Sequence, residues 1–276
     1  MFFHYQVTKY NPCNRDVAGR YLKNEWTSYC DIGKSFCDGI LSFDDYIDVE
    51  NKYIESVLQF MNGNQIRLLS IVALEKKKNP KYDPHTTALM TDVFEDVKNG
   101  DAVTADIIDV ICRLILREFL WCKLEANQVM QVHFSYDYYM FILSRSSCNG
   151  VVQNIERRGL FVEKYKSPYF INDAFVNSLN IMDGVIVYNE FDIDEDLPFH
   201  DQPDSFREHV LRIQFGHNLL IDVGWRPAFN QNGSFVVAII KHYDWQKPIK
   251  RFKAKSFKAL KKSIEDAVLI IKHQTR

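Results

Sequence analysis

The sequence predicts an α+β protein in which antiparallel sheets are each covered by amphipathic helices, and in which the chain forms two similar-sized halves. Short segments that alternate apolar and polar residues recur along the 276 residues, separated by Gly, Asn and Pro, as strands and turns do. A few longer segments repeat apolar residues every three or four positions, which is typical of helices. Aromatic residues make up 14% of the chain, and this high fraction favours sheets.

The first half is expected to begin with a strand at 2–9. A helix is predicted at 43–61, because its apolar residues fall on one face and its acidic residues on the others. Ser42 is the expected N-cap, with Asp45 three residues later as in a capping box. The other expected elements of this half are a strand at 66–74, a helix at 104–116 and strands at 119–125, 129–135 and 138–144, with loops at 13–41 and between Lys76 and Asp101.

A cluster of Ser, Asn and Gly at 146–150 predicts the boundary between two domains. We expect an N-terminal α+β domain at 1–148 and, at 149–276, an antiparallel sheet with a terminal helix. An Asn/Gly turn at 230–233 joins two strands of that sheet as a hairpin. The elements expected in this half are helices near 151–158 and at 256–272, and strands at 160–165, 185–188, 209–215, 219–225, 234–243 and 250–253.

Composition excludes several classes of protein. The formal net charge is only −2, so the whole molecule is not a polyelectrolyte binder. No apolar run approaches the roughly 20 residues that a membrane span needs, and the N-terminus lacks the features of a signal peptide. We therefore expect a cytoplasmic protein without a membrane partner. Its cysteines, none of them in a C-x-x-C pair, are predicted to be free and mostly packed thiols; they are Cys13, Cys30, Cys37, Cys112, Cys122 and Cys148.

The chain contains no recognisable catalytic motif. Nucleophile-elbow and phosphate-loop patterns are absent, and no cysteine stands out as a nucleophile. Asp204, His209 and His217 lie close in the sequence but lack the spacing of metal ligands. We predict that the protein is not an enzyme and needs neither a cofactor nor a metal. Its function is therefore sought in binding.

The charged residues are segregated along the second half. Acidic residues dominate 190–208, with Pro198 and Pro203 marking a loop, and only Arg207 opposes them. Such a loop is either a solvated connection or a surface that presents carboxylates to a basic partner, raising the association rate. The acidic residues are Glu190, Asp192, Asp194, Glu195, Asp196, Asp201, Asp204 and Glu208.

The C-terminal segment carries the opposite sign. A Lys-rich helix either solubilises the outer face of a packed element or holds phosphates, so a nucleic-acid-binding or regulatory module is the alternative function. Trp225 and Trp245 nearby are either core residues or anchors of an interface. The basic residues are Lys247, Lys250, Arg251, Lys253, Lys255, Lys258, Lys261, Lys262, Lys272 and Arg276.

Three stretches together resemble bacterial immunity proteins that are encoded beside secreted nuclease toxins, including those of contact-dependent growth inhibition systems. One is EWTSYCDIGKSF at 25–36, followed by LSFDDYIDVENKYI at 41–54. Another is VHFSYDYYMFI at 132–142. The third is IDVGWRPAFNQNGSF at 221–235, with Asp244, Trp245 and Pro248 after it.

The resemblance implies an antitoxin-like inhibitor that works by protein–protein interaction. It would bind one cognate toxin domain, a ribonuclease similar to the EndoU type, and block its active site without contacting nucleic acid directly. Because a nuclease active site is basic, carboxylates of Asp192, Asp194, Glu195 and Asp196 are expected to occupy it as phosphate mimics. Trp225 and Trp245 complete the expected toxin-binding set. The resemblance does not define the oligomeric state.

Overall fold

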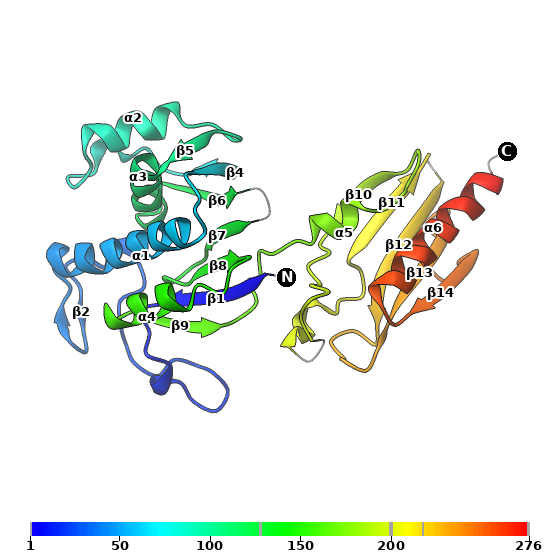
Figure 1. The fold of residues 1–276 in the computed structure, drawn as a ribbon, viewed down its shortest axis with the longest axis horizontal. Helices are drawn as coiled ribbons and strands as arrows, with labels where there is room; N and C mark the ends of the chain where they lie inside the picture. Colours follow the sequence, from blue (N-terminus) through cyan, green and yellow to red (C-terminus); the bar gives the residue numbers. More distant parts are fainter. Residues whose placement is uncertain (1, 127–128, 199–200, 217, 275–276) are drawn as a thin grey trace. The chain divides into compact units, whose positions relative to one another are not determined.

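The computed structural model describes residues 2–126, 129–198, 201–216 and 218–274, and the chain divides into two compact units, Met1–Ser167 and Pro168–Arg276 (Figure 1). Each unit contains an antiparallel sheet with helices packed on it, so the predicted α+β class is confirmed. Among the described residues, no helix is long and apolar enough to cross a membrane.

The first unit is built on a seven-stranded antiparallel sheet. Its strands are β1 (Phe3–Thr8), β4 (Leu68–Lys76), β5 (Ala102–Thr104), β6 (Leu120–Ala126), β7 (Met130–Phe134), β8 (Met140–Ser144) and β9 (Phe161–Lys164). Their order across the sheet is β5-β4-β6-β7-β8-β1-β9. The helices are α1 (Phe43–Gly63), α2 (Ala88–Asp96), α3 (Ala105–Leu116) and α4 (Asn149–Arg157), and a small hairpin is formed by β2 (Ser35–Phe36) and β3 (Gly39–Ile40).

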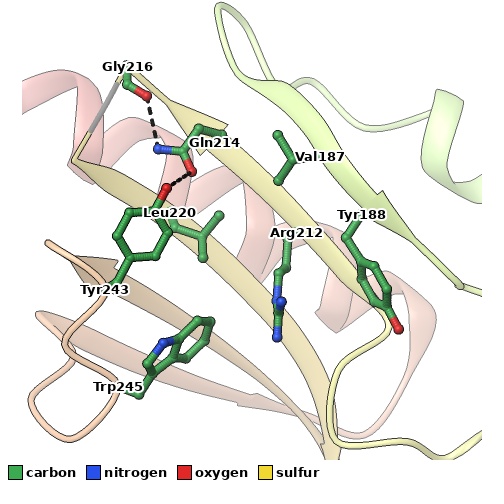
Figure 2. A pocket seen from close by; sticks show the side chains of 8 residues that line it. All are labelled: Val187, Tyr188, Arg212, Gln214, Gly216, Leu220, Tyr243 and Trp245. Carbon is green, nitrogen blue, oxygen red and sulfur yellow. Dashed lines mark hydrogen bonds between the residues drawn. The ribbon is translucent and has the colours of Figure 1, made fainter.

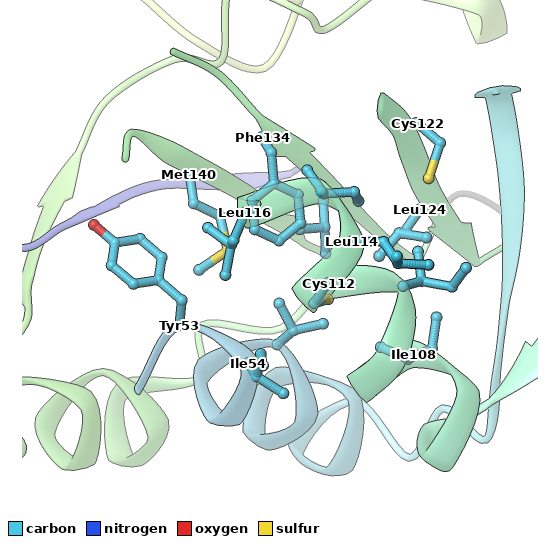
Figure 3. Packing of buried hydrophobic residues seen from close by; sticks show 14 of the residues in the cluster. Tyr53, Ile54, Ile108, Cys112, Leu114, Leu116, Cys122, Leu124, Phe134 and Met140 are labelled. Carbon is cyan, nitrogen blue, oxygen red and sulfur yellow. The ribbon is translucent and has the colours of Figure 1, made fainter. Parts of the chain in front are cut away.

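The core of this unit lies between the sheet and helices α1 and α3. Figure 3 shows Tyr53 and Ile54 of α1 and Ile108 of α3 directed toward the strands. All three side chains are at most 2% exposed. Burial of an aliphatic side chain such as Ile108 contributes about 1.5–3 kcal/mol to the free energy of unfolding. The 3.6-residue apolar repeat in both helices is therefore what holds them on the sheet.

Helix α1 begins where its sequence predicts. The Ser42 hydroxyl oxygen accepts a hydrogen bond from the Asp45 backbone N–H, and the Asp45 carboxylate accepts one from the Ser42 backbone N–H. This capping box satisfies two backbone donors that a helix otherwise leaves without partners.

A buried ion-pair network ties α1 to α3. The Glu50 carboxylate is fully buried and accepts two hydrogen bonds from Arg117, at 2.7 Å from Nε and 2.8 Å from Nη2. Arg113 Nη1 donates to the same carboxylate at 2.7 Å. Arg117 Nη1 also donates to the His85 carbonyl at 2.8 Å, so the network reaches the segment before α2. A charge this deeply buried is tolerated only because it is paired and hydrogen-bonded.

The division between the units differs from the boundary expected at 148/149. Strand β9 pairs with β1 at the edge of the first sheet, with Val7 opposite Val162. Helix α4 contacts both α1 and β9. Residues 149–167 therefore belong to the first unit, because their backbone and apolar groups are satisfied there.

The structure also changes two other expectations for the first unit. The region between Lys76 and Asp101 contains helix α2 and leads into strand β5, whereas a loop was expected.

All six cysteines are free, but only Cys112 and Cys122 are buried. Burial raises the pKa of the Cys122 thiol to about 12, which keeps it protonated at neutral pH.

The second unit is a five-stranded antiparallel sheet in the order β10-β11-β12-β13-β14. Helix α6 packs along one face of the sheet, against β12, β13 and β14 (Figure 1). The strands are β10 (Val185–Asn189), β11 (Leu211–Phe215), β12 (Leu219–Arg226), β13 (Ser234–Lys241) and β14 (Lys250–Ala254), and the helices are α5 (Asp173–Asn177) and α6 (Phe257–Gln274).

Alternation along these strands separates two faces of the sheet. Ile213, Ile221 and Ile239 are fully buried in the core under α6, on the face that the expected terminal helix covers. Gly224 lies on the opposite face, where the backbone of Glu208 crosses it. A Cβ atom at residue 224 would stand 1.7 Å from the Glu208 carbonyl oxygen, so only glycine fits. The segment before β11 is thereby held against the sheet.

Candidate binding site on the second sheet

The face of the second sheet opposite to α6 carries an open concavity of about 430 Å³. Arg212 and Gln214 of β11 and Leu220 of β12 form its floor, because they alternate with the core residues of their strands. Its walls come from β10 and from the connection between β13 and β14. The lining residues are Val187, Tyr188, Arg212, Gln214, Gly216, Leu220, Tyr243 and Trp245 (Figure 2).

Two aromatic rings flank the Arg212 side chain. The guanidinium carbon lies 5.3 Å from the ring centre of Tyr188 and 5.0 Å from that of Trp245, both within cation–π distance. Figure 2 shows the guanidinium directed between these two rings. The rings shield the cation from water, which strengthens its interaction with an anion.

Arg212 is oriented by an acidic partner on the neighbouring strand. Its Nε donates to Asp222 Oδ1 at 3.1 Å, because Arg212 and Asp222 are opposite each other in the β11–β12 register. Asp222 is buried, and its two carboxylate oxygens lie 2.9 and 3.0 Å from His209 Nδ1. Among the described residues, Arg212 Nη1 and Nη2 have no hydrogen-bond partner, so two N–H groups at each remain available.

A bulge in β10 shapes the opposite wall. The register between β10 and β11 shifts between Ile186 and Tyr188. The extra residue allows consecutive side chains, Val187 and Tyr188, to line the same concavity. The pKa of Tyr188 is raised to about 12 by burial and by a hydrogen bond with Glu190, so the phenol is neutral at physiological pH.

Gln214 and Tyr243 close the far end of the site. Gln214 Nε2 donates to the carbonyl oxygens of Gly216 and Leu219, at 2.9 and 3.1 Å. Its Oε1 accepts a hydrogen bond from the Tyr243 hydroxyl at 3.3 Å (Figure 2). The Gln214 amide is thereby fixed, and the Tyr243 ring is held over the strands.

Strand β10 is also an exposed edge of the sheet. Val185 is 62% exposed and Val187 is 56% exposed, although both are β-branched apolar residues. Among the described residues, β10 pairs only with β11, so its outer edge carries no partner strand. Exposed apolar side chains beside an unpaired edge are typical of a surface that contacts another protein.

The described part of the acidic segment 190–208 is packed in part against the second unit and is not solvated throughout. Asp192 and Asp194 are only 5% and 4% exposed, so two of the four expected toxin-binding carboxylates do not face solvent. Arg207 pairs with Asp192 at 3.0 Å. The buried Gln202 side chain exchanges hydrogen bonds with the backbone of Asp194, at 2.9 and 2.7 Å, and holds the segment in place.

Other carboxylates of this segment are exposed. Glu195 and Asp196, the remaining two of the expected set, lie on the surface. We refer to the exposed carboxylates of this segment as the acidic surface; they are Glu190, Glu195, Asp196, Asp201, Asp204 and Glu208.

The two tryptophans of the expected set lie in different environments. Trp225 is 1% exposed, stacks on Phe206 with ring centres 4.2 Å apart, and donates from Nε1 to the Asn230 carbonyl. It is therefore a core residue. Trp245 is 38% exposed and forms a wall of the concavity.

The sequence interpretation did not identify Arg212, Tyr188, His209 or Asp222 as a site. Tyr188, Arg212 and Asp222 lie on three different strands, and the strand register brings their side chains together. His209 had been considered only as a metal ligand. Within the described part of the chain, no group of three or more His, Cys, Asp or Glu could hold a metal ion, and His217 lies outside the described residues.

The basic residues of the C-terminal segment do not form one surface. Arg251 and Lys253 project on the face opposite to α6, because they pair with Ala238 and Val236. Exposed Lys258 and Lys262 belong to α6, which covers the other face. Arg276 lies outside the described residues.

Comparison of the chain with protein families, with curated proteins and with solved structures finds no match.

Proposed function

We propose that this protein acts by binding another protein, as an immunity protein that occupies a cognate nuclease toxin and blocks its active site. The observation that carries the proposal is the concavity in which Arg212, Tyr188 and Trp245 meet beside an exposed strand edge. Arg, Tyr and Trp are the residue types that most often supply the binding free energy of an interface.

The acidic surface supports the same proposal. Glu195 and Asp196 follow a segment whose backbone Gln202 holds in place, so their carboxylates are presented at a defined position. A nuclease active site is basic because it binds phosphates, and carboxylates of opposite sign would raise the association rate and the specificity. An inhibitor of a lethal enzyme needs a Kd near or below nanomolar, or about −12 kcal/mol.

The nature of the toxin is proposed from the sequence resemblance. The three resembling stretches lean toward a ribonuclease partner similar to the EndoU type, inhibited in the cytoplasm of the producing cell. The third stretch, at 221–235, covers most of β12 and the start of β13, and thus adjoins the strands that form the floor of the concavity.

Nucleic-acid binding by the C-terminal helix is the weaker alternative. Phosphate binding along a duplex or a single strand requires basic groups on one continuous surface. Here the basic side chains of β14 and those of α6 lie on opposite faces of the second sheet. Salt-dependent binding of RNA by the purified protein alone would nevertheless favour the alternative over the immunity function.

The direct test is co-expression with the toxin domain of the open reading frame directly upstream. We expect growth to be rescued and the two proteins to co-purify. The Trp245→Ala variant should weaken the complex by about 2 kcal/mol or more, as loss of an interface anchor does. The matched control is Lys262→Ala, an exposed residue on the α6 side of the sheet.

A second variant tests the acidic surface separately. Replacing Glu195, Asp196, Asp201 and Asp204 by the corresponding amides should lower the association rate and its dependence on salt. If cells die equally with and without this protein, the proposed function is wrong. If rescue occurs but neither variant changes the affinity, the toxin binds elsewhere on the molecule.

A further inference from the structure

We propose that the Arg212 concavity is a carboxylate-binding subsite, which receives a Glu or Asp side chain from an exposed segment of the partner protein. The assignment of a protein as the source rests on the proposed function, whereas the carboxylate chemistry rests on the geometry of this site alone. The acidic surface adjoins this subsite at Glu190, which hydrogen-bonds the Tyr188 side chain, but the subsite itself presents the Arg212 cation and so prefers an anion.

The terminal nitrogens of the Arg212 guanidinium are available to a ligand. Asp222 holds only Nε of Arg212, and the two terminal nitrogens face the concavity without a partner among the described residues. Nη1 and Nη2 form a planar fork that matches the two oxygens of a carboxylate. The Tyr188 and Trp245 rings flank the guanidinium, so a ligand is directed to the edge that carries these N–H groups.

The charges around Arg212 favour a singly charged anion. The Arg212 cation and the Asp222 anion offset each other, and His209 lies within 3.0 Å of the same carboxylate. A singly charged carboxylate adds one negative charge opposite Arg212. A phosphate dianion would bring a second charge close to Asp222 and would be repelled. The site therefore favours carboxylates over phosphates.

The concavity is open and borders an apolar strand edge. Sites for free metabolites enclose most of their ligand, whereas this one is open on one side. Val187 belongs both to the lining and to the exposed β10 edge, so an acidic side chain entering the site would bring its own backbone against apolar surface. This continuity indicates a side chain of a protein as the ligand.

The subsite can be tested without knowledge of the toxin. The purified full-length protein is titrated with N-acetyl-glutamate N-methylamide, while the Trp245 indole N–H and the Arg212 Nε–H are observed by NMR. We expect both signals to shift with saturation, at a Kd in the range of about 1–50 mM for so small a ligand. The neutral glutamine analogue should give no saturable shift, and inorganic phosphate should bind more weakly than the glutamate probe.

Variants separate the subsite from a general response of the surface to anions. Arg212→Lys removes the fork but keeps the charge, and should weaken binding about tenfold or more. Arg251→Lys is the matched control, an exposed arginine of the same face, and should leave the affinity unchanged. Asp222→Asn should reduce the preference for glutamate over phosphate, because the repulsion is removed.

The outcomes distinguish this proposal from the immunity function. Equal shifts with glutamate and glutamine, or with wild type and Arg212→Lys, would overturn the carboxylate subsite even if the toxin is neutralised. If glutamate binds through Arg212 but Arg212→Lys leaves the affinity for the toxin unchanged, the carboxylate subsite stands. The toxin then does not supply the carboxylate that binds there. Tighter binding of phosphate than of glutamate would overturn the charge argument.

Discussion

His133 of β7 is an imidazole held away from water. It is 1% exposed, and its Nδ1 lies 2.8 Å from the Ser167 hydroxyl. The pKa of His133 is lowered to about 3, mainly by burial and in smaller part by the nearby Lys123 and His4. The residue is therefore neutral in the folded protein throughout the physiological range.

The stability of the first unit should depend on this residue in acid. In the unfolded chain His133 binds a proton as the pH falls through about 6.5, but in the folded chain only near 3. Its contribution to the free energy of unfolding is complete above 6.5 and is lost as the pH falls toward 3, by about 1.4 kcal/mol per pH unit. Urea unfolding of wild type and His133→Gln at pH 7.5, 5.5 and 4.5 measures this term. Parallel losses in the two proteins would assign the acid sensitivity to other groups.

Residue type alone does not show which of the two tryptophans is a core residue and which lies at the surface. Trp225 precedes Arg226 and Trp245 lies between Asp244 and Gln246, yet only Trp225 is enclosed, because Phe206 stacks on it and Phe235 packs edge-on against it. Asp192 and Asp194 illustrate the same difficulty. Their burial depends on Arg207 and on Gln202, whose positions follow from the path of the chain rather than from local composition.

At the scale of elements, the pairing of α1 with α3 depends on one carboxylate. Glu50 receives three guanidinium hydrogen bonds within 2.8 Å. Removing one partner of such a buried pair leaves a charge that solvent does not reach.

Arg117→Met should therefore lower the free energy of unfolding by about 3–5 kcal/mol. The double variant Glu50→Leu with Arg117→Met should recover part of that loss, because no charge is then left buried. Chemical denaturation measures both variants, with Arg20→Met as the exposed control on a surface ion pair. A double variant less stable than Arg117→Met would show that the pair itself stabilises the helices.

Substitution of Gly224 should also lower the stability of the protein, for a steric reason. Any Cβ atom there collides with the Glu208 carbonyl, which is backbone and has little room to move. Gly224→Ala should lower the melting temperature by several degrees, corresponding to about 1–3 kcal/mol of overpacking. Gly150→Ala in α4 is the control, because a Cβ atom there meets nothing within 4 Å and alanine favours helix. Equal melting temperatures for wild type and Gly224→Ala would mean that the crossing segment can shift freely.

Elements with a clear local signal are found where the sequence predicts them, including short ones such as α4 and β11, whereas α2 and α5 were missed. The capping box at Ser42 and Asp45 and the apolar repeat of α6 are local signals, and both elements are found close to the expected positions. Helices α2 and α5 span only nine and five residues, so their patterns do not stand out from loops. The site at Arg212 was not predictable in this way, because it depends on register between strands.

At the scale of the whole molecule, the position of the division can be tested by truncation. A fragment of residues 1–167 contains the complete seven-stranded sheet, whereas a fragment of residues 1–148 lacks β9 and α4. We expect the longer fragment to fold cooperatively, and the shorter one to be less stable by several kcal/mol or to aggregate through the uncovered β1 edge. Thermal unfolding followed by circular dichroism compares them. Equal stability of the two fragments would place the boundary near 148 after all.

The two borders of the second sheet carry very different residues. Strand β14 includes Lys250, Arg251 and Lys253, whose like charges oppose the approach of a second copy, whereas β10 reads VIVYN and has no such protection. Self-association would thus occur only through the β10 edge and would stop at a symmetric dimer. The charged β14 edge leaves no second site at which a polymer could grow. Sedimentation velocity at increasing concentration should show a monomer–dimer equilibrium that Val187→Lys abolishes, and higher oligomers would contradict this asymmetry.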